Sequence, residues 1–365
     1  MKLGIIGLPQ CGKTTLFNAL TGGKKPTGQM AGGGKVQIHS AIVNVPDQRV
    51  DWLSQHYRPK RTTYTKVTFS DIAGVQGDRV GFSPTLLNAL SQVEGFVHVV
   101  RTFQEPSVPH PLERMDAASD ISALQDEFTL NDMLTVERKL QLLQEEWSKG
   151  GGRERTVIER EQRLFSQLQA ALESGYMLHE LQLGAEDVRL LSGFGLLTRK
   201  PVLLVLNSDE SAPRKQEILG PEFTGQQAQN MLTLMGKIEM EIAQLDEMDA
   251  AFFMREYSLN EPGLTRVIRK AYDMLGLRSF FTVSTEEVRA WQLNAGASAR
   301  QAAGVIHSNM QAGFIRAEVM AFADLKQMGS EAAMKSAGKW RLEGKNYAVQ
   351  DGDMLQVRFS PPARK

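Results

Sequence analysis

Eight residues near the start of the chain have the types and spacing of a phosphate-binding loop. The stretch Gly7-Leu-Pro-Gln-Cys-Gly-Lys-Thr14 follows the apolar run at 3–6 and precedes a helical pattern. In a G-x-x-x-x-G-K-[S/T] loop, successive backbone N–H groups curl round the β-phosphate, and the second glycine lets the chain approach without a Cβ clash. The residues expected to contact a nucleoside triphosphate are Pro9, Gln10, Cys11, Gly12, Lys13, Thr14 and Thr15.

Two side chains of this loop are expected to act on the phosphates and their metal ion. Lys13 reaches the β- and γ-phosphates and is assigned a catalytic role, and Thr14 offers its hydroxyl to Mg²⁺. The helix that begins here adds the positive end of its dipole. The alternative, a simple glycine turn, is disfavoured because a strand pattern precedes the loop and a helix pattern follows it.

A second segment supplies the acidic side of the metal site. Asp71-Ile-Ala-Gly74 is a D-x-x-G element at the end of an apolar run, so Asp71 is expected to hold Mg²⁺ through water. Gly74 is assigned a catalytic role because its N–H can sense the γ-phosphate. The next position usually carries a water-orienting Gln, but here it is Val75, and Gln76 comes one residue late. Hydrolysis should therefore be slow, or use a polar group from another segment.

The segment Asn207-Ser-Asp-Glu210 bears on the choice of base. It occupies the place of an N-K-x-D element, whose Asp accepts two hydrogen bonds from guanine, but Lys is absent and Glu210 replaces the Asp. The longer side chain shifts the carboxylate out of the guanine register, so ATP is expected and GTP is the alternative. A polar helix cap is the other interpretation of these residues. Gly236, after the run at 231–235, is assigned to the same nucleotide site.

Composition excludes several classes of protein. The 365 residues include 42 basic and 42 acidic side chains, which argues against binding nucleic acid by bulk charge, so no DNA partner is expected. The single cysteine, Cys11, excludes an internal disulfide framework and suits a reducing compartment. No window approaches the roughly 18 apolar residues of a membrane span. We therefore expect a cytoplasmic protein with no membrane partner.

The order of apolar runs indicates an α/β fold with a mostly parallel sheet. Runs at 3–6, 66–71, 96–101 and 201–207 each precede helical periodicity, and 231–235 supplies one more strand. Between 119 and 195 strand signals vanish, and two charged amphipathic helices flank the triple glycine at 150–152, which predicts a projecting helical hairpin. Two ordinary surface helices are the alternative.

From residue 279 the pattern changes to a small α+β module. The stretches FFTV, EVRAWQL, IRAEVMAF, NYAVQ and MLQVRF are predicted as strands around one helix, ARQAAGVIHSNM at 299–310. The glycine-rich stretch at 22–35 contains few apolar residues and is predicted to be a mobile loop.

Taken together, these motifs resemble the Obg-like ATPases, or YchF family, a branch of the P-loop GTPases that prefers ATP. GLPQCGKTTLFNALT is similar to the family's phosphate loop, NSDE to its N-x-x-E, and EVRAWQLNAGASARQAAGVIHSNMQAGFIRAEVMAF and AGKWRLEGKNYAVQDGDML to its C-terminal module. The resemblance covers most of the chain. It implies a P-loop G-domain at 1–118 and 196–278, a coiled-coil insertion at 119–195 and a TGS-type β-grasp domain at 279–365.

The resemblance also implies an activity and a partner. The family hydrolyses ATP slowly with a hydrophobic residue in place of the catalytic Gln, as Val75 is here, and a loop histidine, His110 in this chain, assists. A ribosome or ribosomal RNA is the implied partner, bound through a basic face of the helical hairpin or of the C-terminal module. The C-terminal candidates are Lys335, Lys339, Trp340, Arg341 and Lys345, with Trp340 available for stacking. A solvated surface with a packed Trp is the alternative.

Three departures from the family pattern affect these expectations. The family's phosphate-loop Asn, linked to potassium use, is Gln10 here, so potassium dependence stays open. Lys35 falls where the switch threonine would stand, and the run after D-x-x-G is shortened. These changes indicate a divergent member, and they leave open a nucleotide-sensing adaptor with negligible turnover.

Overall fold

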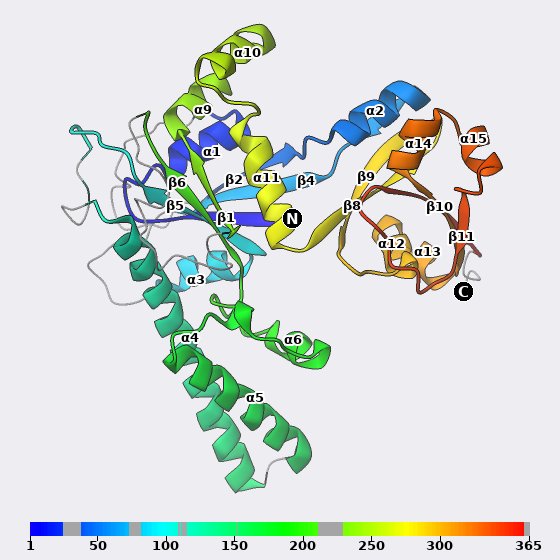
Figure 1. Cartoon of the computed structure of the whole chain (residues 1–365). Coiled ribbons are helices and arrows are strands. Elements are labelled where there is room, and N and C mark those ends of the chain that lie inside the picture. The colour runs from blue at the N-terminus through cyan, green and yellow to red at the C-terminus, as the bar shows by residue number, and fades with distance from the viewer. Residues whose placement is uncertain are drawn as a thin grey trace. The chain divides into compact units, whose positions relative to one another are not determined.

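The chain folds into two compact units in a computed structural model that describes residues 1–24, 38–72, 82–108, 110, 115–150, 152–210 and 229–360. The first unit contains Met1–Ala41 and Thr68–Val267. The second contains Ile42–Val67 and Ile268–Lys365. Figure 1 labels the helices and strands of both units. Among the described residues, no helix is both long and apolar enough to cross a bilayer.

The first unit is built on the parallel sheet that the apolar runs predict. Its strand order is β2-β4-β1-β5-β6-β7. The five strands from β4 to β7 in this order are all parallel. The bounds are β1 Lys2–Ile6, β2 Ile38–Asn44, β4 Lys66–Ile72, β5 Gly95–Arg101, β6 Val202–Asn207 and β7 Met231–Leu234. Because parallel strands end at one edge, this edge brings the phosphate loop, Asp71 and Asn207 together. The edge strand β2, which the sequence analysis did not predict, is largely exposed.

Some helices pack on this sheet, and others extend away from it (Figure 1). They are α1 Lys13–Thr21, α3 Pro84–Ser91, α4 Ala117–Lys149, α5 Arg155–Glu173, α6 Ala185–Leu191, α9 Gly236–Ile242, α10 Glu247–Glu256 and α11 Gly263–Met274, with a 3₁₀ turn at Leu178–Glu180. One core cluster joins the sheet to α3 and α4 through Phe96 and Phe128, whose ring centroids are 5.1 Å apart. Burial of such aromatic side chains is a main source of stability in a layer of this kind.

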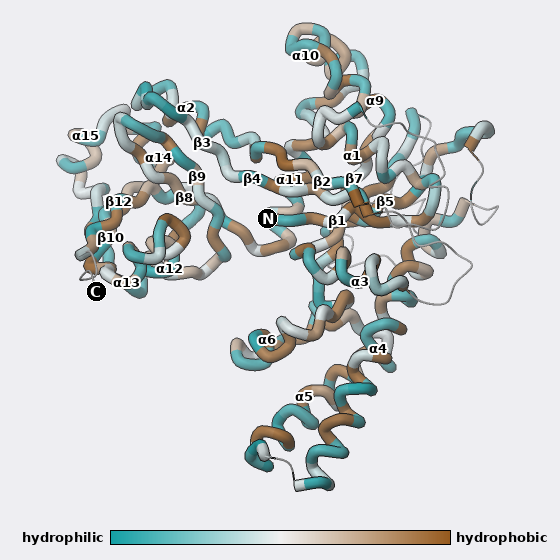
Figure 2. Tube along the Cα trace, turned by 180° about the vertical axis from the view of Figure 1, so that it is seen from behind, coloured by the Kyte–Doolittle hydropathy of each residue, from teal (hydrophilic) through white to brown (hydrophobic). Residues whose placement is uncertain are grey.

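Helices α4 and α5 form the predicted hairpin. Gly150 ends α4 in the left-handed region with φ 65°, where glycine is favoured. The two helices share a core that includes Leu143, Ile158 and Phe165, and in Figure 2 apolar residues (brown) alternate with hydrophilic ones (teal) along both helices. The buried carboxylate of Asp132 accepts hydrogen bonds from the backbone N–H groups of Leu197 and Thr198, at 2.9 and 2.7 Å, and so fixes α4 to the segment before β6.

The second unit contains a mixed sheet in the order β11-β10-β12-β8-β9-β3. The antiparallel hairpin β8–β9, the helix after it and the central parallel pair β8 and β12 form a β-grasp arrangement. The strands are β3 Arg61–Thr63, β8 Leu277–Val283, β9 Glu287–Asn294, β10 Phe314–Ala321, β11 Arg341–Glu343 and β12 Asp353–Phe359. The helices are α2 Gln48–Tyr57, α12 Ala299–Ile306, α13 Ser308–Ala312, α14 Phe322–Met328 and α15 Glu331–Ser336.

Two predictions for this unit were wrong. NYAVQ does not form a named strand: Ala348 makes only an isolated bridge with Ser298, and the edge strand is β11 instead. The helix expected at 299–310 divides into α12 and α13, because His307 adopts extended backbone and its side chain caps α13 by accepting from the Asn309 N–H at 3.1 Å.

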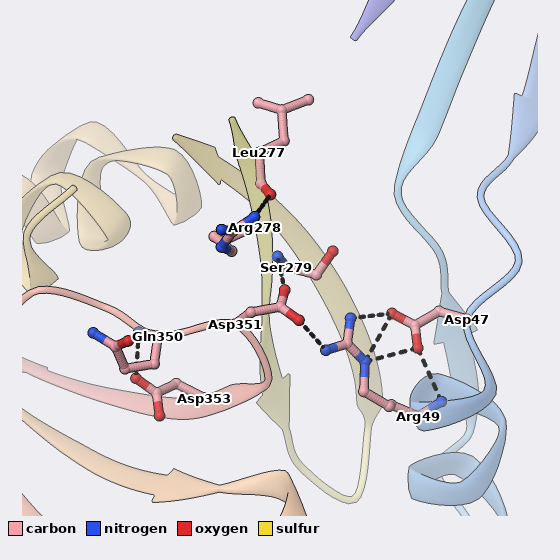
Figure 3. A network of polar contacts seen from close by, with 8 residues as sticks. All are labelled: Asp47, Arg49, Leu277, Arg278, Ser279, Gln350, Asp351 and Asp353. Carbon is pink, nitrogen blue, oxygen red and sulfur yellow. Dashed lines mark hydrogen bonds and ion pairs between the residues drawn. The ribbon is translucent and has the colours of Figure 1, made fainter. Parts of the chain in front are cut away.

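The segment 42–67 belongs to the second unit, although the sequence analysis placed it in the G-domain. Figure 3 shows the polar network that fixes it. The Arg49 guanidinium pairs with Asp47 at 2.8 Å and with Asp351 at 2.6 Å, and the other Asp351 oxygen accepts the Ser279 N–H at 2.8 Å. Arg49 also stacks over the Phe281 ring at 5.1 Å. Helix α2 and strand β3 thus complete the β-grasp sheet and its core.

Candidate nucleotide-binding site

The phosphate loop needs its two glycines for different close approaches. Gly7 has φ 146°, and a Cβ there would lie 2.3 Å from the Val99 carbonyl oxygen. Gly12 has φ 97°, and its Cβ would lie 2.1 Å from Asn207 Nδ2. Because backbone and a packed amide cannot both move aside, only glycine fits at these two positions. The loop therefore lies directly against β5 and the end of β6.

The first turn of α1 is suited to an anion. Its N-cap is Gly12, which makes no side-chain capping bond, and the turn contains no acidic residue. The first N–H groups of a helix have no partner within the helix, so here they remain available to phosphate oxygens. Lys13 is buried, and its ammonium group donates to the carbonyls of Gly7 and Leu8 at 3.1 and 2.8 Å. The cation thus lies across the mouth of the loop.

Gln10 is one of few non-glycine residues of the described chain with positive φ, at 60°. Asn tolerates this left-handed region better than most side chains, because its short amide can bond locally. Position 10, where the resemblance implies an Asn in the family, therefore adopts a backbone conformation that Asn tolerates well.

Thr14 and Asp71, the two residues expected to hold a metal ion, contact each other in the fold. The Thr14 hydroxyl donates to Asp71 Oδ2 at 3.0 Å, across 57 positions of sequence. Asp71 is buried at the end of β4, where it pairs with Ile5 of β1. A hydroxyl and a carboxylate side by side are hard oxygen ligands of the kind that Mg²⁺ prefers, with nucleotide phosphates and water completing its shell. The residues present therefore fit Mg²⁺.

Asn207 connects three segments of the site. Its amide Nδ2 donates to the Cys11 carbonyl at 3.0 Å, and its Oδ1 accepts the Gly236 N–H at 3.0 Å. Asn207 is buried, so both bonds lie out of water. The structure thus brings together Gly12, Asn207 and Gly236. Glu210 lies exposed beyond them, just before the residues outside the described chain.

A loop after β5 borders the site. Arg101 is buried and donates to the carbonyls of Phe103 and Val108 at 3.3 and 2.8 Å. Its guanidinium also stacks on the Phe103 ring at 4.5 Å, and Phe103 is the aromatic residue nearest to Gly12. At the end of the loop, His110 Nε2 lies 3.1 Å from Asp120 Oδ2 on α4. The pair is close enough to the phosphate loop for Asp120 to affect the pKa of Cys11.

Two buried titratable groups lie behind the loop. Burial, reinforced by the charge of Lys13, lowers the pKa of His98 to about 3, so this imidazole is neutral at physiological pH. Burial also raises the pKa of the Cys11 thiol. A buried protonated thiol is chemically inert, so Cys11 serves packing and backbone contacts rather than nucleophilic chemistry.

The structure does not bear equally on every residue proposed from sequence. Pro9, Cys11, Thr14 and Thr15 lie in the loop or the first turn of α1, while Gly74, Val75 and Lys35 fall outside the described residues. The sequence analysis missed His98, Arg101 and Asp120. For Arg101 there was a signal: a charged residue ends an apolar strand at the edge where ligands bind in open α/β sheets.

Comparisons with known proteins show the family of this chain. A family model described as a 50S ribosome-binding GTPase matches residues 2–139, and a YchF-GTPase C-terminal model, described as a protein of unknown function (DUF933), matches residues 277–360. The chain is 36% identical to "Ribosome-binding ATPase YchF" of Haemophilus influenzae, over 98% of this chain and 99% of that protein. The chain belongs to the YchF family of Obg-like ATPases.

Further relatives span bacteria and eukaryotes. The Bacillus subtilis protein of the same name is 36% identical over 99% of both chains, and "Obg-like ATPase 1" of Oryza sativa subsp. japonica is 33% identical over 99% of this chain and 92% of its own. The solved structure of the Schizosaccharomyces pombe YchF GTPase matches with a TM-score of 0.84 at 27% identity, covering 98% of this chain and 97% of that one. The α/β P-loop fold and the family's nucleoside triphosphate chemistry are thereby established for this chain.

Proposed function

We propose that this protein is a Mg²⁺-dependent ATPase that slowly hydrolyses ATP to ADP and phosphate and acts as a cytoplasmic switch on the ribosome. The observation that carries the proposal is the juxtaposition of an uncapped α1, Lys13, and the Thr14–Asp71 pair at one sheet edge. The names of its relatives supply the ribosome and the preference for ATP.

Each group has a defined task in the proposed reaction. Backbone N–H groups of the loop bind the β-phosphate, and Lys13 leaves its two carbonyls to neutralise charge on the β- and γ-oxygens. Thr14 and Asp71 would hold Mg²⁺, which would offset negative charge on the phosphates. The Gly74 N–H contacts the γ-phosphate in the same proposal.

His110 is the proposed water-orienting residue. Its Nε2 lies 3.1 Å from Oδ2 of the buried Asp120, and a carboxylate partner of this kind fixes the orientation of the imidazole ring. This arrangement would replace the missing Gln of the D-x-x-G element. We expect His110→Ala to lower the rate of phosphate release under saturating ATP without a matching loss of ATP affinity. A wild-type protein with no phosphate release would instead be a nucleotide-sensing adaptor.

Base choice is the second part of the proposal. GTP is the competing substrate, because one matching model and one solved relative are described as GTPases. An exposed Glu210 in place of Asp would leave guanine's two donors poorly paired, and such groups cost about 1–3 kcal/mol each when buried. ATP should therefore bind at least about tenfold more tightly than GTP, a difference of roughly 1.4 kcal/mol.

Competition between the two nucleotides, measured by titration calorimetry, tests this preference. The double variant Ser208→Lys with Glu210→Asp should narrow or reverse it. Preferential binding of GTP by the wild-type protein would assign the chain as a GTPase.

The proposed ribosome contact uses the basic residues of the second unit. Lys339 and Arg341 are exposed, although Lys339 lies 3.5 Å from Asp324 and Arg341 3.2 Å from Glu343. Trp340 is less available than the sequence suggested, because its indole N–H donates to Glu318 at 2.8 Å and the Lys335 ammonium lies 4.1 Å from its ring centroid. To bind Lys339 and Arg341, RNA phosphates must therefore compete with the carboxylates of Asp324 and Glu343.

Ribosome co-sedimentation tests this surface. Reversal of Lys339 and Arg341 to Glu should reduce co-sedimentation and its dependence on salt, with ATP affinity unchanged, because phosphate contacts release counterions. A matched reversal of Lys60, an exposed lysine paired with Glu286 in the same unit, serves as control. Equal effects of the two reversals would remove the C-terminal surface from the proposal.

A further inference from the structure

Helix α10 presents apolar side chains to solvent instead of to the protein. None of its ten residues, Glu247–Glu256, is buried. Met248 is 82% exposed, Phe252 54% and Phe253 42%, and Leu245, just before the helix, is 38% exposed. Figures 1 and 2 both show α10 beyond α9 and away from the sheet of the first unit. Because no residue of α10 is buried, burial of an apolar face contributes little to the stability of this helix. An isolated helix of this length is only marginally stable in water.

The exposed apolar residues form one surface. Met248 and Phe252 are four positions apart and so lie on one face of α10, and Phe253 lies edge-on to Phe252 with ring centroids 5.9 Å apart. Leu245 is two residues before the first residue of the helix. We call these four residues the α10 patch. Scattered surface hydrophobics need no explanation, but a contiguous group with two aromatic rings is typical of a protein-binding site.

Charge around the α10 patch narrows the class of partner. The segment 241–256 contains five acidic residues and one basic residue, and the acidic ones are Glu241, Asp246, Glu247, Asp249 and Glu256, all exposed. An acidic rim repels RNA phosphates and anionic lipid headgroups. It also opposes a contact between two copies of this patch, because identical acidic rims would face each other. It attracts a positively charged protein surface and speeds their encounter.

We propose that the α10 patch is a docking site for a basic protein segment that presents an apolar face, such as a lysine-rich amphipathic helix. The patch supplies two aromatic anchors and a sulfur-containing side chain that adapts to different shapes. The acidic rim supplies orientation and selectivity. This inference is independent of the proposed ATPase activity and of the RNA contact of the second unit.

A labelled synthetic helix tests the proposal with the full-length protein. The probe is a peptide of about 14 residues, about four turns, with Leu at i, i+3, i+4 and i+7 spacing and Lys elsewhere. Fluorescence anisotropy should show binding that weakens with added salt. The triple variant Met248→Ser, Phe252→Ser, Phe253→Ser and the charge reversal Glu247→Lys with Asp249→Lys should each lower the affinity by at least about tenfold.

The matched control removes apolar exposure elsewhere in the chain. Leu130, Leu134 and Leu142 on α4 are 43%, 54% and 56% exposed, and their triple replacement by Ser should leave peptide binding unchanged. Circular dichroism and ATP affinity check that each variant is folded. Equal binding by the α10 variants and wild type, or equal binding of a peptide with Glu in place of Lys, would overturn the proposal. The proposal would also be overturned if mutation of the α10 patch abolished binding to RNA, binding to lipid vesicles or self-association, because the patch would then serve another partner.

Discussion

Asn207 gives the sharpest test of how the nucleotide site is built, because one amide joins three segments. Asn207→Ala would leave the Cys11 carbonyl and the Gly236 N–H without their partner, and the bonds that they lose are both 3.0 Å long and buried. An unsatisfied buried polar group costs about 1–3 kcal/mol, so the two together should lower the free energy of unfolding by roughly 2–6 kcal/mol. At about 2–4 °C per kcal/mol, Tm should fall by roughly 4–24 °C.

Asn207→Asp separates the two bonds. Its carboxylate can still accept the Gly236 N–H but cannot donate to the Cys11 carbonyl, which it would instead repel. We therefore expect a loss of stability from the Cys11 side alone, and a weaker affinity for ATP because the phosphate loop is no longer held beside Gly12. Thermal unfolding without nucleotide and titration calorimetry with ATP measure the two effects.

The neighbouring Ser208 provides the matched control. Its hydroxyl donates to the Leu234 carbonyl over 3.4 Å, a long contact, so Ser208→Ala should change stability by no more than about 0.5–1 kcal/mol. The reasoning is refuted if Asn207→Ala unfolds at the same temperature as Ser208→Ala. It is equally refuted if Asn207→Asp matches the wild type in both assays.

Two further predictions concern charges around the loop. Lys13→Ala should weaken ATP binding by at least about tenfold, because it removes the cation that lies across the loop at 2.8 Å from the Leu8 carbonyl; calorimetry showing wild-type affinity would contradict the site assignment. Because burial lowers the pKa of His98 to about 3, the unfolded chain takes up this proton first as the pH falls. The His98 contribution to stability is thus complete only well above the unfolded pKa of about 6.5, and it falls by roughly 2 kcal/mol between about pH 7 and 5. Denaturant titrations at several pH values should show that the stability of His98→Gln falls less between about pH 7 and 5 than that of the wild type. Parallel pH profiles of the two proteins would contradict this prediction.

Much of the first unit was predictable because its signals are local. The apolar runs at 3–6, 66–71, 96–101 and 201–207 became β1, β4, β5 and β6 with small shifts at their ends. The triple glycine correctly marked the turn of the α4–α5 hairpin, where Gly150 takes the left-handed conformation. Predictions failed where a short segment can pair in more than one way. NYAVQ has the composition of a strand, but β11 three residues before it takes the edge position beside β10.

The functional groups divide in a similar manner. The Thr14–Asp71 pair was predictable because each residue belongs to a motif whose spacing has a mechanical reason. His98 and Asp120 were not, because nothing in an apolar strand run or a charged helix states which side chain will be buried behind the loop. The assignments of Gly74 and His110 as catalytic residues, and of Glu210 as the base-selecting residue, remain predictions.

The sequence by itself determined the phosphate loop, the order of strands along the chain and the apolar periodicity of the helices. These are properties of neighbouring residues, since backbone conformation and side-chain direction repeat over a few positions. Tertiary structure decided which distant segments meet: Asn207 against Cys11, His110 against Asp120, and α2 with β3 in the second unit through Arg49 and Asp351. Such contacts depend on the order of strands in a sheet and on the close packing between its layers. Local periodicity contains neither, so only the folded chain reveals them.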